Sequence, residues 1–526
     1  TILFLFWTIT AMARKMVVAD DEQMTLAQGI GILFSGAVGA LAYTFSDTFW
    51  FSAVEGEVYA YSSFFTALVF WAILKWEEVA DEPGSDRWLI FIAYMMGLSI
   101  GVHLLNLLAI PAIVLVYYFH RFKPNFWGFC LAMVVSAALL AVVLYGLIPG
   151  FVLVAGWFEL LFTNHLGMPF NTGLMVYIIL TLAILVWGIV ETRLARSNTR
   201  MIISVVLSAL IVGIPFFGSS VVLGVFVTAL LLAVLWWQRE RISARWLHTS
   251  LLMIALMLVG YSSYTVIVIR SASDPAMDQN SPDNVFALKY YLNREQYGDR
   301  PLFYGPSYTA QLNYKRDRLN GQDVCRASVI EGDAQYAPHV KTSPDEPDHY
   351  DVVGHKLTYD MCPEFKLFFP RMYSTQASHR EAYETWAGKP RKRVVYDVCG
   401  QRQTGTTPTF GQNLKFFFSY QCNFMYWRYF MWNFAGRQND IQGNGELEHG
   451  NWITGIPLID NALYGNQDLL PDELKQNKGH NVFYCLPLLL GLIGLFWQAW
   501  RGKRGIQQFW VVFFLFFMTG LAIVVY

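Results

Sequence analysis

Long apolar segments separated by short polar connections dominate this chain. Twelve of them are long enough to cross, or nearly cross, a bilayer core that takes about 20 helical residues. They lie at about 1–12, 28–46, 58–75, 88–102, 104–119, 125–147, 172–190, 201–215, 217–237, 247–269, 482–500 and 507–526. This pattern predicts an α-helical polytopic membrane protein with about 12 crossings.

The basic residues indicate which connections share one side of the membrane. Lys or Arg follows every odd-numbered run, from Arg14 after the first to Arg501 after the eleventh. The alternate short connections contain neither residue type and lie at about 47–57, 103, 148–171 and 216. Because basic loops remain on the cytoplasmic side, we predict that these connections and the region 270–481 face outward.

The same alternation decides two ambiguous segments. Residues 88–119 are predicted to make two short passes that turn near Gly101–His103, since one long helix would reverse every later loop. The aromatic segment 414–434 would reverse the last basic loop if it crossed. With its internal Lys415 and Arg428, it is predicted to be a helix lying in the membrane interface.

Composition and segment order divide the chain into three parts. Residues 1–269 form an N-terminal transmembrane region with about ten crossings. Residues 270–481 are rich in Asp, Asn and Pro and are predicted to be an extracytoplasmic α/β domain with the interfacial aromatic helix near 408–434. Residues 482–526 add C-terminal transmembrane helices, and both chain ends are expected to be truncated. A net charge of −1 gives no reason to expect a nucleic-acid partner.

Four cysteines lie in the predicted external region: Cys325, Cys362, Cys399 and Cys422. In an oxidising compartment we expect at least one disulfide among them, with three possible pairings for two bridges. Their spacing contains no CxxC motif, so no zinc site is expected there.

Three carboxylates, Asp47, Glu55 and Glu57, lie in the predicted outer connection after the second run, with no Lys or Arg near them. One interpretation is that the acids cap the next helix and are solvated, since a helix N-terminus favours negative charge. The other is that they face a cavity, where a carboxylate acts as a general base or positions a hydroxyl. The aromatic residues around them favour a site that is not fully solvated.

Other polar residues on the same predicted side are candidates for substrate binding. His103 and Asn106 either satisfy helix ends or contact a headgroup or a sugar, and Tyr59 lies close to the acids in sequence. Arg428 and Arg437 either bind an anionic lipid headgroup or hold a lipid-linked phosphate. Asn164 and His165 lie in a segment that resembles an interfacial amphipathic helix, for which a membrane anchor is a more typical role than a site.

Several strings in the chain are distinctive of one membrane family. "FSAVEGEVYA", "GLSIGVHLLNLLAIPAI", "YFMWNFAGRQNDIQG" and "GNWITGI" resemble the polytopic family of domain of unknown function 2723. That family is similar to GT-C glycosyltransferases and to protein O-mannosyltransferases. The resemblance implies a bacterial enzyme of the Gram-negative inner membrane, with its large domain in the periplasm.

The resemblance also implies a reaction. A sugar, mannose or another hexose, would pass from a polyprenyl-phosphate donor to Ser or Thr of an exported protein, with no further cofactor and with metal dependence left open. Glu55, Glu57 and Asp47 would serve catalysis, and Tyr59, His103, Asn106, Arg428 and Arg437 would bind substrate. The family's Asp-Cys-Gly-Glu-Phe-like string is absent, so the main base is expected upstream of this sequence.

Two rival functions belong to other classes. A transporter or lipid flippase needs polar residues deep in several spans, and the apolar runs contain almost none. A non-catalytic subunit of an envelope complex is compatible with the same residues.

Overall fold

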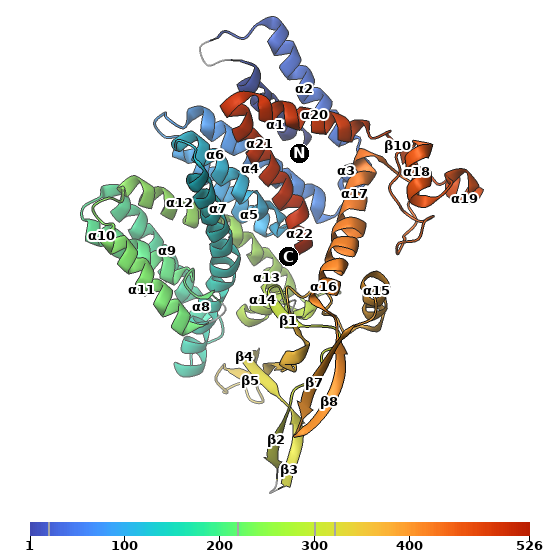
Figure 1. The fold of residues 1–526 in the computed structure, drawn as a ribbon. Helices are drawn as coiled ribbons and strands as arrows, with labels where there is room; N and C mark the ends of the chain where they lie inside the picture. Colours follow the sequence, from blue (N-terminus) through green and yellow to red (C-terminus); the bar gives the residue numbers. More distant parts are fainter. Residues whose placement is uncertain (19–21, 218–219, 299–300, 320–321, 526) are drawn as a thin grey trace.

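A computed structural model describes residues 1–18, 22–217, 220–298, 301–319 and 322–525. The chain is mostly helical, with a separate sheet-containing region that extends from one side of a helical body (Figure 1). The helices before that region are α1 (Ile2–Val17), α2 (Leu26–Thr44), α3 (Asp47–Val54), α4 (Val58–Val79), α5 (Asp86–Ile100), α6 (Ile110–Arg121), α7 (Phe126–Ala141), α8 (Ile148–Leu160), α9 (Thr172–Leu194), α10 (Asn198–Ile211), α11 (Val221–Trp237), α12 (Ala244–Tyr261) and α13 (Thr265–Ser271).

The prediction of 12 crossings is not supported. Among the described residues, seven helices are long and apolar enough to cross a membrane. They are Leu26–Thr44, Val58–Val79, Leu104–Arg121, Phe126–His165, Thr172–Leu194, Ala244–Ser271 and Gly502–Val525.

The remaining apolar runs do form helices, but short ones. α1, α5 and α10 have 16, 15 and 14 residues, α11 has 17, and α20 (Leu486–Trp500) has 15. At 1.5 Å per residue these helices are about 21 to 26 Å long, whereas the hydrocarbon core is about 30 Å thick. An apolar run therefore predicted a helix correctly in each case without predicting a full crossing.

Most of the predicted outer connection at 148–171 continues the preceding helix, which corrects the expectation of a separate interfacial helix there. The segment Phe126–His165 is one helical stretch of 40 residues, with π-helical turns at Val142–Leu147 and Leu161–His165. Its length is about 60 Å at 1.5 Å per residue, which is about twice the hydrocarbon core. The expected interfacial anchor around Asn164 and His165 is the end of this long helix.

The predicted break near Gly101–His103 agrees with the structure, while the two crossings stay a prediction because α5 is not one of the seven long spans. α5 ends at Ile100, and a 3₁₀ turn (Leu104–Ala109) leads into α6. α5 packs along α12, and where the two helices cross, a Cβ on Gly97 would lie 2.1 Å from the Met257 carbonyl oxygen. Only glycine fits at such a contact between two backbones.

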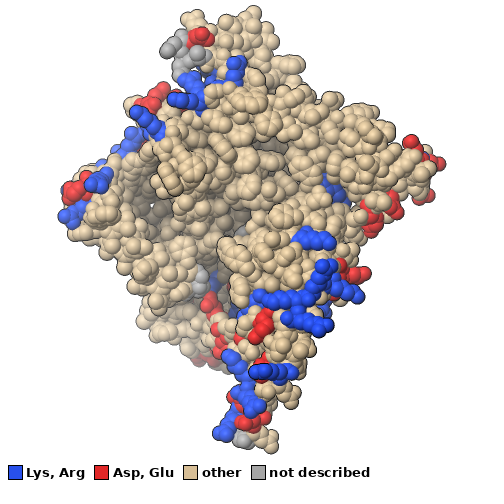
Figure 2. All heavy atoms as spheres, viewed as in Figure 1, with Lys and Arg blue, Asp and Glu red and all other residues tan. Residues whose placement is uncertain are grey.

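Helix ends that carry basic residues meet on one face of the helical body. Lys15 at the end of α1 pairs with Glu77 of α4, and Arg245 of α12 lies 2.6 Å from Asp86 of α5. Figure 2 shows Lys and Arg along the upper left edge of the helical body, and a second group mixed with acids over the sheet-containing region. This clustering is what the alternation of basic loops predicts, while the side of the membrane stays a prediction.

In its described residues, the region between α13 and α20 combines short helices with four small sheets. The sheets pair β1 (Tyr304–Pro306) with β6 (Lys366–Phe368), β4 (Val329–Pro338) with β5 (Tyr350–Tyr359), and β9 (Gly436–Arg437) with β10 (Asn481–Val482). The largest has the order β3 (Gln322–Ala327), β2 (Tyr314–Leu319), β7 (Lys392–Val398) and β8 (Gln401–Thr407). The helices are α14 (Val285–Leu292), α15 (Ala377–Ala387), α16 (Phe410–Phe416), α17 (Arg428–Phe434), α18 (Pro457–Tyr464) and α19 (Asp472–Lys475).

The predicted disulfide is confirmed. Cys325 on β3 bonds Cys399 in the turn between β7 and β8, across 74 positions of sequence. Cys362 is a buried free thiol, and Cys422 is a partly buried one.

The aromatic segment forms a continuous helix from Phe410 to Phe434, with a π-helical middle. It is not one of the seven spans. Figure 1 shows it on the side of the helical body away from the basic edge. Its Phe430 ring lies 5.6 Å from Phe516 of α21 (Gly502–Phe516), so the helix is attached to the last spans.

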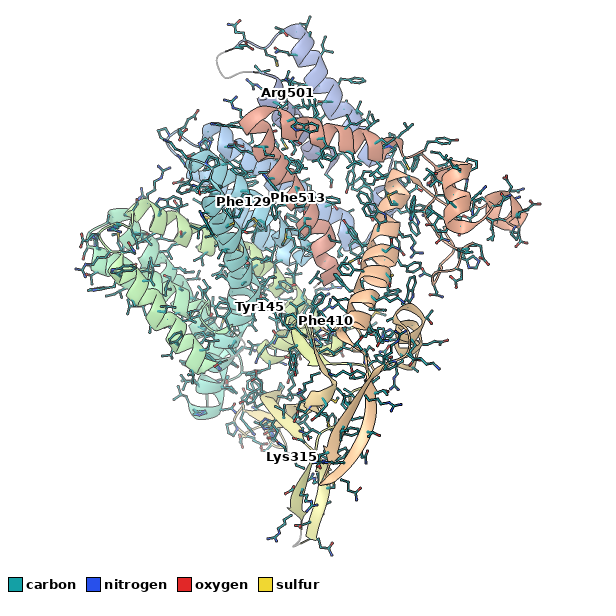
Figure 3. All side chains as sticks on the ribbon, viewed as in Figure 1. Phe129, Tyr145, Lys315, Phe410, Arg501 and Phe513 are labelled. Atoms are coloured by element: carbon teal, nitrogen blue, oxygen red, sulfur yellow. A yellow bond between two sulfur atoms is a disulfide. The ribbon has the colours of Figure 1, made fainter. Side chains whose placement is uncertain are left out.

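The C-terminal helices pack against the N-terminal bundle. Figure 3 labels Phe129 on α7 and Phe513 on α21 in the same part of the molecule. The Phe129 ring lies 5.5 Å from Trp510 and 5.8 Å from Phe514. α21 thus lies beside α6 and α7, and α22 (Ala522–Val525), which follows a π-helical turn, contacts the aromatic segment.

Candidate functional site

The first candidate acid, Asp47, meets the candidate cation Arg437 across 390 positions of sequence. Arg437 Nη2 lies 3.3 Å from Asp47 Oδ2. Asp47 is the first residue of α3, where an acid is favoured by the helix dipole. The Arg437 side chain is 13% exposed and the Asp47 side chain 39%, so the pair lies at the edge of the surface.

A two-stranded ladder holds Arg437 in place. β9 and β10 pair antiparallel with Arg437 opposite Asn481. The Asn481 side chain accepts from Arg437 N at 2.9 Å and donates to Asp47 Oδ2 at 2.6 Å. Arg437 Nε also donates to the Gly479 carbonyl at 2.9 Å. Asp47, Arg437 and Asn481 form one hydrogen-bonded cluster, which we call the Asp47–Arg437 cluster.

Glu55 and Glu57 lie at the other end of α3 and are exposed. Glu55 is the C-cap of α3, Gly56 turns the chain at φ +72°, and Glu57 is the N-cap of α4 without a side-chain cap bond. The capping interpretation is therefore right about position, while the cap hydrogen bond is absent. α3 spans about 12 Å at 1.5 Å per residue, which separates Glu55 from Asp47.

Aromatic residues surround these two acids and stay exposed. Trp50, Phe51 and Tyr59 are 50 to 52% exposed, and Tyr61 is 54% exposed. Exposed aromatic rings at this density are typical of a membrane interface or of a ligand surface. The acids therefore lie within an amphipathic patch rather than in a plain polar loop.

Tyr59 and His103 are brought together, with ring centroids 5.9 Å apart. His103 Nδ1 accepts the backbone N–H of Leu105, which places the ring proton on Nε2 in the neutral form. Burial, and then the charge of Arg294, lower the pKa of His103 and favour that neutral form. The imidazole thus offers one N–H donor.

Asn106 is fully buried and lies within the 3₁₀ turn Leu104–Ala109. Its Nδ2 donates to Ser99 Oγ at 2.9 Å, while its Oδ1 has no hydrogen-bond partner in the described part of the chain. The interpretation that His103 and Asn106 satisfy helix ends is supported at His103, which accepts from Leu105 N, whereas the Asn106 contact joins two side chains. A structural role of Asn106 does not explain why its Oδ1 has no partner there.

Arg428 is buried and serves the loop that follows its helix. Its Nε donates to Phe424 O at 3.0 Å and its Nη1 to Gly450 O at 3.2 Å. Its guanidinium carbon lies 3.9 Å from the Phe424 ring centroid, and the residue is only 4% exposed. Arg437 is therefore the better placed of the two arginines to meet a phosphate.

The predicted residues form two small groups in the described structure, Asp47 with Arg437 and Tyr59 with His103. Convergence of Glu55 and Glu57 with either group stays a prediction. Asn481 was missed, because a two-residue strand far along the chain gives no sequence pattern that links it to residue 47.

Comparison with known proteins gives two matches. Residues 1–125 match the family model described as the N-terminal domain of the protein O-mannosyl-transferase TMEM260. The N-terminal quarter of the chain is similar to an O-mannosyl-transferase domain. Residues 298–418 match a family of unknown function, DUF8416. No curated protein and no solved structure matches the chain. The resemblance to domain of unknown function 2723 stays a prediction.

Proposed function

We propose that this protein is a membrane glycosyltransferase of the protein O-mannosyltransferase type. The observation that carries the proposal is the match of residues 1–125 to an O-mannosyl-transferase N-terminal domain. That segment includes Asp47, Glu55, Glu57, Tyr59, His103 and Asn106. The donor is a polyprenyl-phosphate hexose, and the acceptor is a Ser or Thr hydroxyl of an exported protein.

The reaction is a single displacement at the anomeric carbon. A carboxylate takes the hydroxyl proton, and the hydroxyl oxygen forms a bond to the anomeric carbon. The bond from that carbon to the phosphate oxygen breaks, and its electron pair leaves with the polyprenyl phosphate. A cation beside the leaving phosphate stabilises the developing charge.

The contacts of the candidate residues support a division of roles. Asp47 Oδ2 is already engaged by Arg437 and Asn481, so Asp47 positions the cation. Arg437 faces the phosphate, and Glu55 or Glu57, exposed among aromatic rings, serves as base or positions the acceptor. A further acid upstream of this sequence completes the site, as the resemblance implies.

The charge pattern supports one orientation in the membrane. The basic helix ends share one face, and basic faces remain cytoplasmic. The Asp47–Arg437 cluster and the sheet-containing region then face the periplasm of a Gram-negative cell. A lipid-linked donor and an exported acceptor meet on that side.

Transfer from polyprenyl-phosphate mannose to a Ser/Thr-rich peptide in membranes that contain the full-length protein tests the proposal. We expect Arg437→Gln to lower the rate by about 100-fold, the loss typical of one oxyanion donor. Glu82→Gln, an exposed acid on the basic side, is the matched control and should keep the wild-type rate. Absence of transfer from any polyprenyl-phosphate hexose by the wild-type protein would overturn the proposal.

A further inference from the structure

The loop end of the β4–β5 hairpin brings together side chains that can bind a metal ion. His339 follows the last residue of β4, and His349 precedes the first residue of β5. The His339 N–H donates to the His349 carbonyl at 2.9 Å, which extends the ladder by one step. Cross-strand neighbours share a face, and so do residues two apart on one strand. His339, His349 and Asp351 therefore point to the same side.

The three side chains are close enough to share one ion. One ligand atom from each lies within 4.8 Å of the other two. His339 Nδ1 is 2.7 Å from Asp351 Oδ2, and His349 Nε2 is 3.4 Å from Asp351 Oδ1. The imidazole rings stack with centroids 4.1 Å apart and an interplanar angle of 23°.

The second nitrogen of each ring is held by an acceptor. His339 Nε2 lies 3.1 Å from Glu346 Oε1, and His349 Nδ1 lies 3.3 Å from the Pro347 carbonyl. An acceptor at one ring nitrogen places the proton there and turns the lone pair of the other nitrogen outward. The other nitrogen of each ring, His339 Nδ1 and His349 Nε2, faces Asp351 and carries either a proton or a metal ion there. A carboxylate or carbonyl behind each imidazole is the usual support for a metal-binding histidine.

An imidazole nitrogen and a carboxylate oxygen 2.7 Å apart repel each other unless a proton or a metal ion is bound there. Two imidazoles and one carboxylate suit zinc and other first-row transition metals. Zinc bonds of about 2.0 to 2.2 Å in a tetrahedron place ligand atoms about 3.3 Å apart, whereas the two imidazoles lie 2.7 and 3.4 Å from Asp351, so a small opening at His339 would admit the ion. We propose that His339, His349 and Asp351 bind one divalent transition-metal ion, with the fourth position left to water.

The position of the cluster gives the ion a structural consequence. Tyr350 lies between two of the three ligands and is 4% exposed, with its ring 4.8 Å from Phe170 and from Phe286. Asn164, near the end of the long helix Phe126–His165, pairs with the Tyr350 backbone. Metal binding therefore holds the loop end of the hairpin in place around Tyr350, the residue that attaches the hairpin to the membrane-spanning part.

Zinc binding to the purified full-length protein, with any affinity tag removed and after chelator treatment, tests this proposal. We expect one equivalent of zinc per chain, and at least about 100-fold weaker binding in His339→Ala, His349→Ala and Asp351→Asn. Glu346→Gln, which weakens the support behind His339 and also changes an acceptor of Thr342, should weaken binding by about 10-fold. His355→Ala, an exposed histidine on the same hairpin, should bind zinc as the wild type does.

A second measurement does not depend on any variant folding correctly. Zinc should slow hydrogen exchange of the Tyr350 amide in the wild-type protein. X-ray absorption of the bound ion should show two imidazole ligands. No stoichiometric binding at micromolar protein and zinc would overturn the proposal and leave a proton between the side chains. Binding that persists unchanged in all three ligand variants would overturn it as well.

Discussion

Asn164 and Tyr350 pair like neighbouring residues of a sheet, although 186 positions separate them. Asn164 Nδ2 donates to the Tyr350 carbonyl and Tyr350 N donates to Asn164 Oδ1, both at 2.8 Å. Close to this pair, Glu159 is fully buried and accepts from the Tyr350 hydroxyl at 3.2 Å and from Leu174 N at 3.0 Å. The long helix and the sheet-containing region are thus joined by polar contacts as well as by apolar packing.

Removing the Asn164 amide should loosen this junction. Asn164→Ala deletes two hydrogen bonds, each contributing about 0.5 to 1.5 kcal/mol. We expect faster hydrogen exchange at the Tyr350 amide and a loss of about 1 to 2 kcal/mol in local stability. His165→Ala changes the next, exposed residue and should alter neither quantity. Unchanged exchange in Asn164→Ala would show that apolar packing alone carries the junction.

The orientation can be tested by labelling cysteines introduced at two sites. A membrane-impermeant thiol reagent applied to intact cells should label Ser343→Cys, in the β4–β5 hairpin, after the outer membrane is permeabilised. Ser197→Cys, between α9 and α10, should stay unlabelled until the inner membrane is opened. The reverse pattern would contradict the assignment of basic loops to the cytoplasm.

The ion pair of the candidate site should show measurable coupling. Asp47→Asn and Arg437→Gln, alone and combined, form a double-mutant cycle for thermal stability. We expect a coupling energy of about 1 kcal/mol, because the pair is partly exposed and shares Asn481. The same cycle for the exposed pair Asp317 and Arg326 should give less. A coupling near zero at the first pair would remove Asp47 from its positioning role.

Alkaline pH should destabilise the sheet-containing region through Tyr308. Burial, and then the charge of Glu384, raise the pKa of Tyr308 from 10.0 to about 12. The unfolded chain therefore loses this proton before the folded chain does. The contribution to stability is complete below about pH 10 and is lost as the pH rises through about 12. Tyr308→Phe should flatten the decline in denaturant midpoint over that window, and Tyr304→Phe, 60% exposed, should not.

The disulfide should contribute to stability through the unfolded chain. Closing a loop of 74 residues removes conformational entropy equivalent to about 4 kcal/mol. Cys325→Ser should therefore lower the stability of the four-stranded sheet by about 2 to 4 kcal/mol. Peptide mapping without reductant should recover Cys325 linked to Cys399, with Cys362 and Cys422 as free thiols. Any other pairing would contradict the structure.

Sequence alone could predict the helices, since run length and composition are local properties. It failed at Pro149 and Gly150, which resemble a helix end. The chain instead continues through the π-helical turn Val142–Leu147, which adjusts the backbone ahead of the proline. Gly150 serves close packing, because a Cβ there would lie 2.2 Å from the Gly213 carbonyl oxygen. A glycine required by a distant segment cannot be distinguished in sequence from one required by a turn.

For a related reason, the sequence could suggest residues of the candidate site but not which of them lie together. Asp47 and Arg437 were each chosen from local surroundings, and their pairing depends on how segments far apart in sequence pack. The histidines of the hairpin were missed although "HVKTSPDEPDHYD" places a His at each end of a loop and an Asp two residues later. The two His residues stand opposite each other across the loop, and Asp351 lies on the same side of its strand as His349. This spacing could have been recognised once β4 and β5 were expected to be neighbouring strands.

The distance along the chain between Asp47 and its partners has a consequence for biosynthesis. Arg437 and Asn481 are translated about 390 and 430 residues after Asp47, so the first helices enter the membrane long before their cluster can form. During that interval α3 carries a carboxylate without its cation, in a chain that is only partly folded. A ribosome that stops before Asn481 releases a protein with every N-terminal helix and no assembled site. The complete Asp47–Arg437 cluster can therefore form only after synthesis has reached β10.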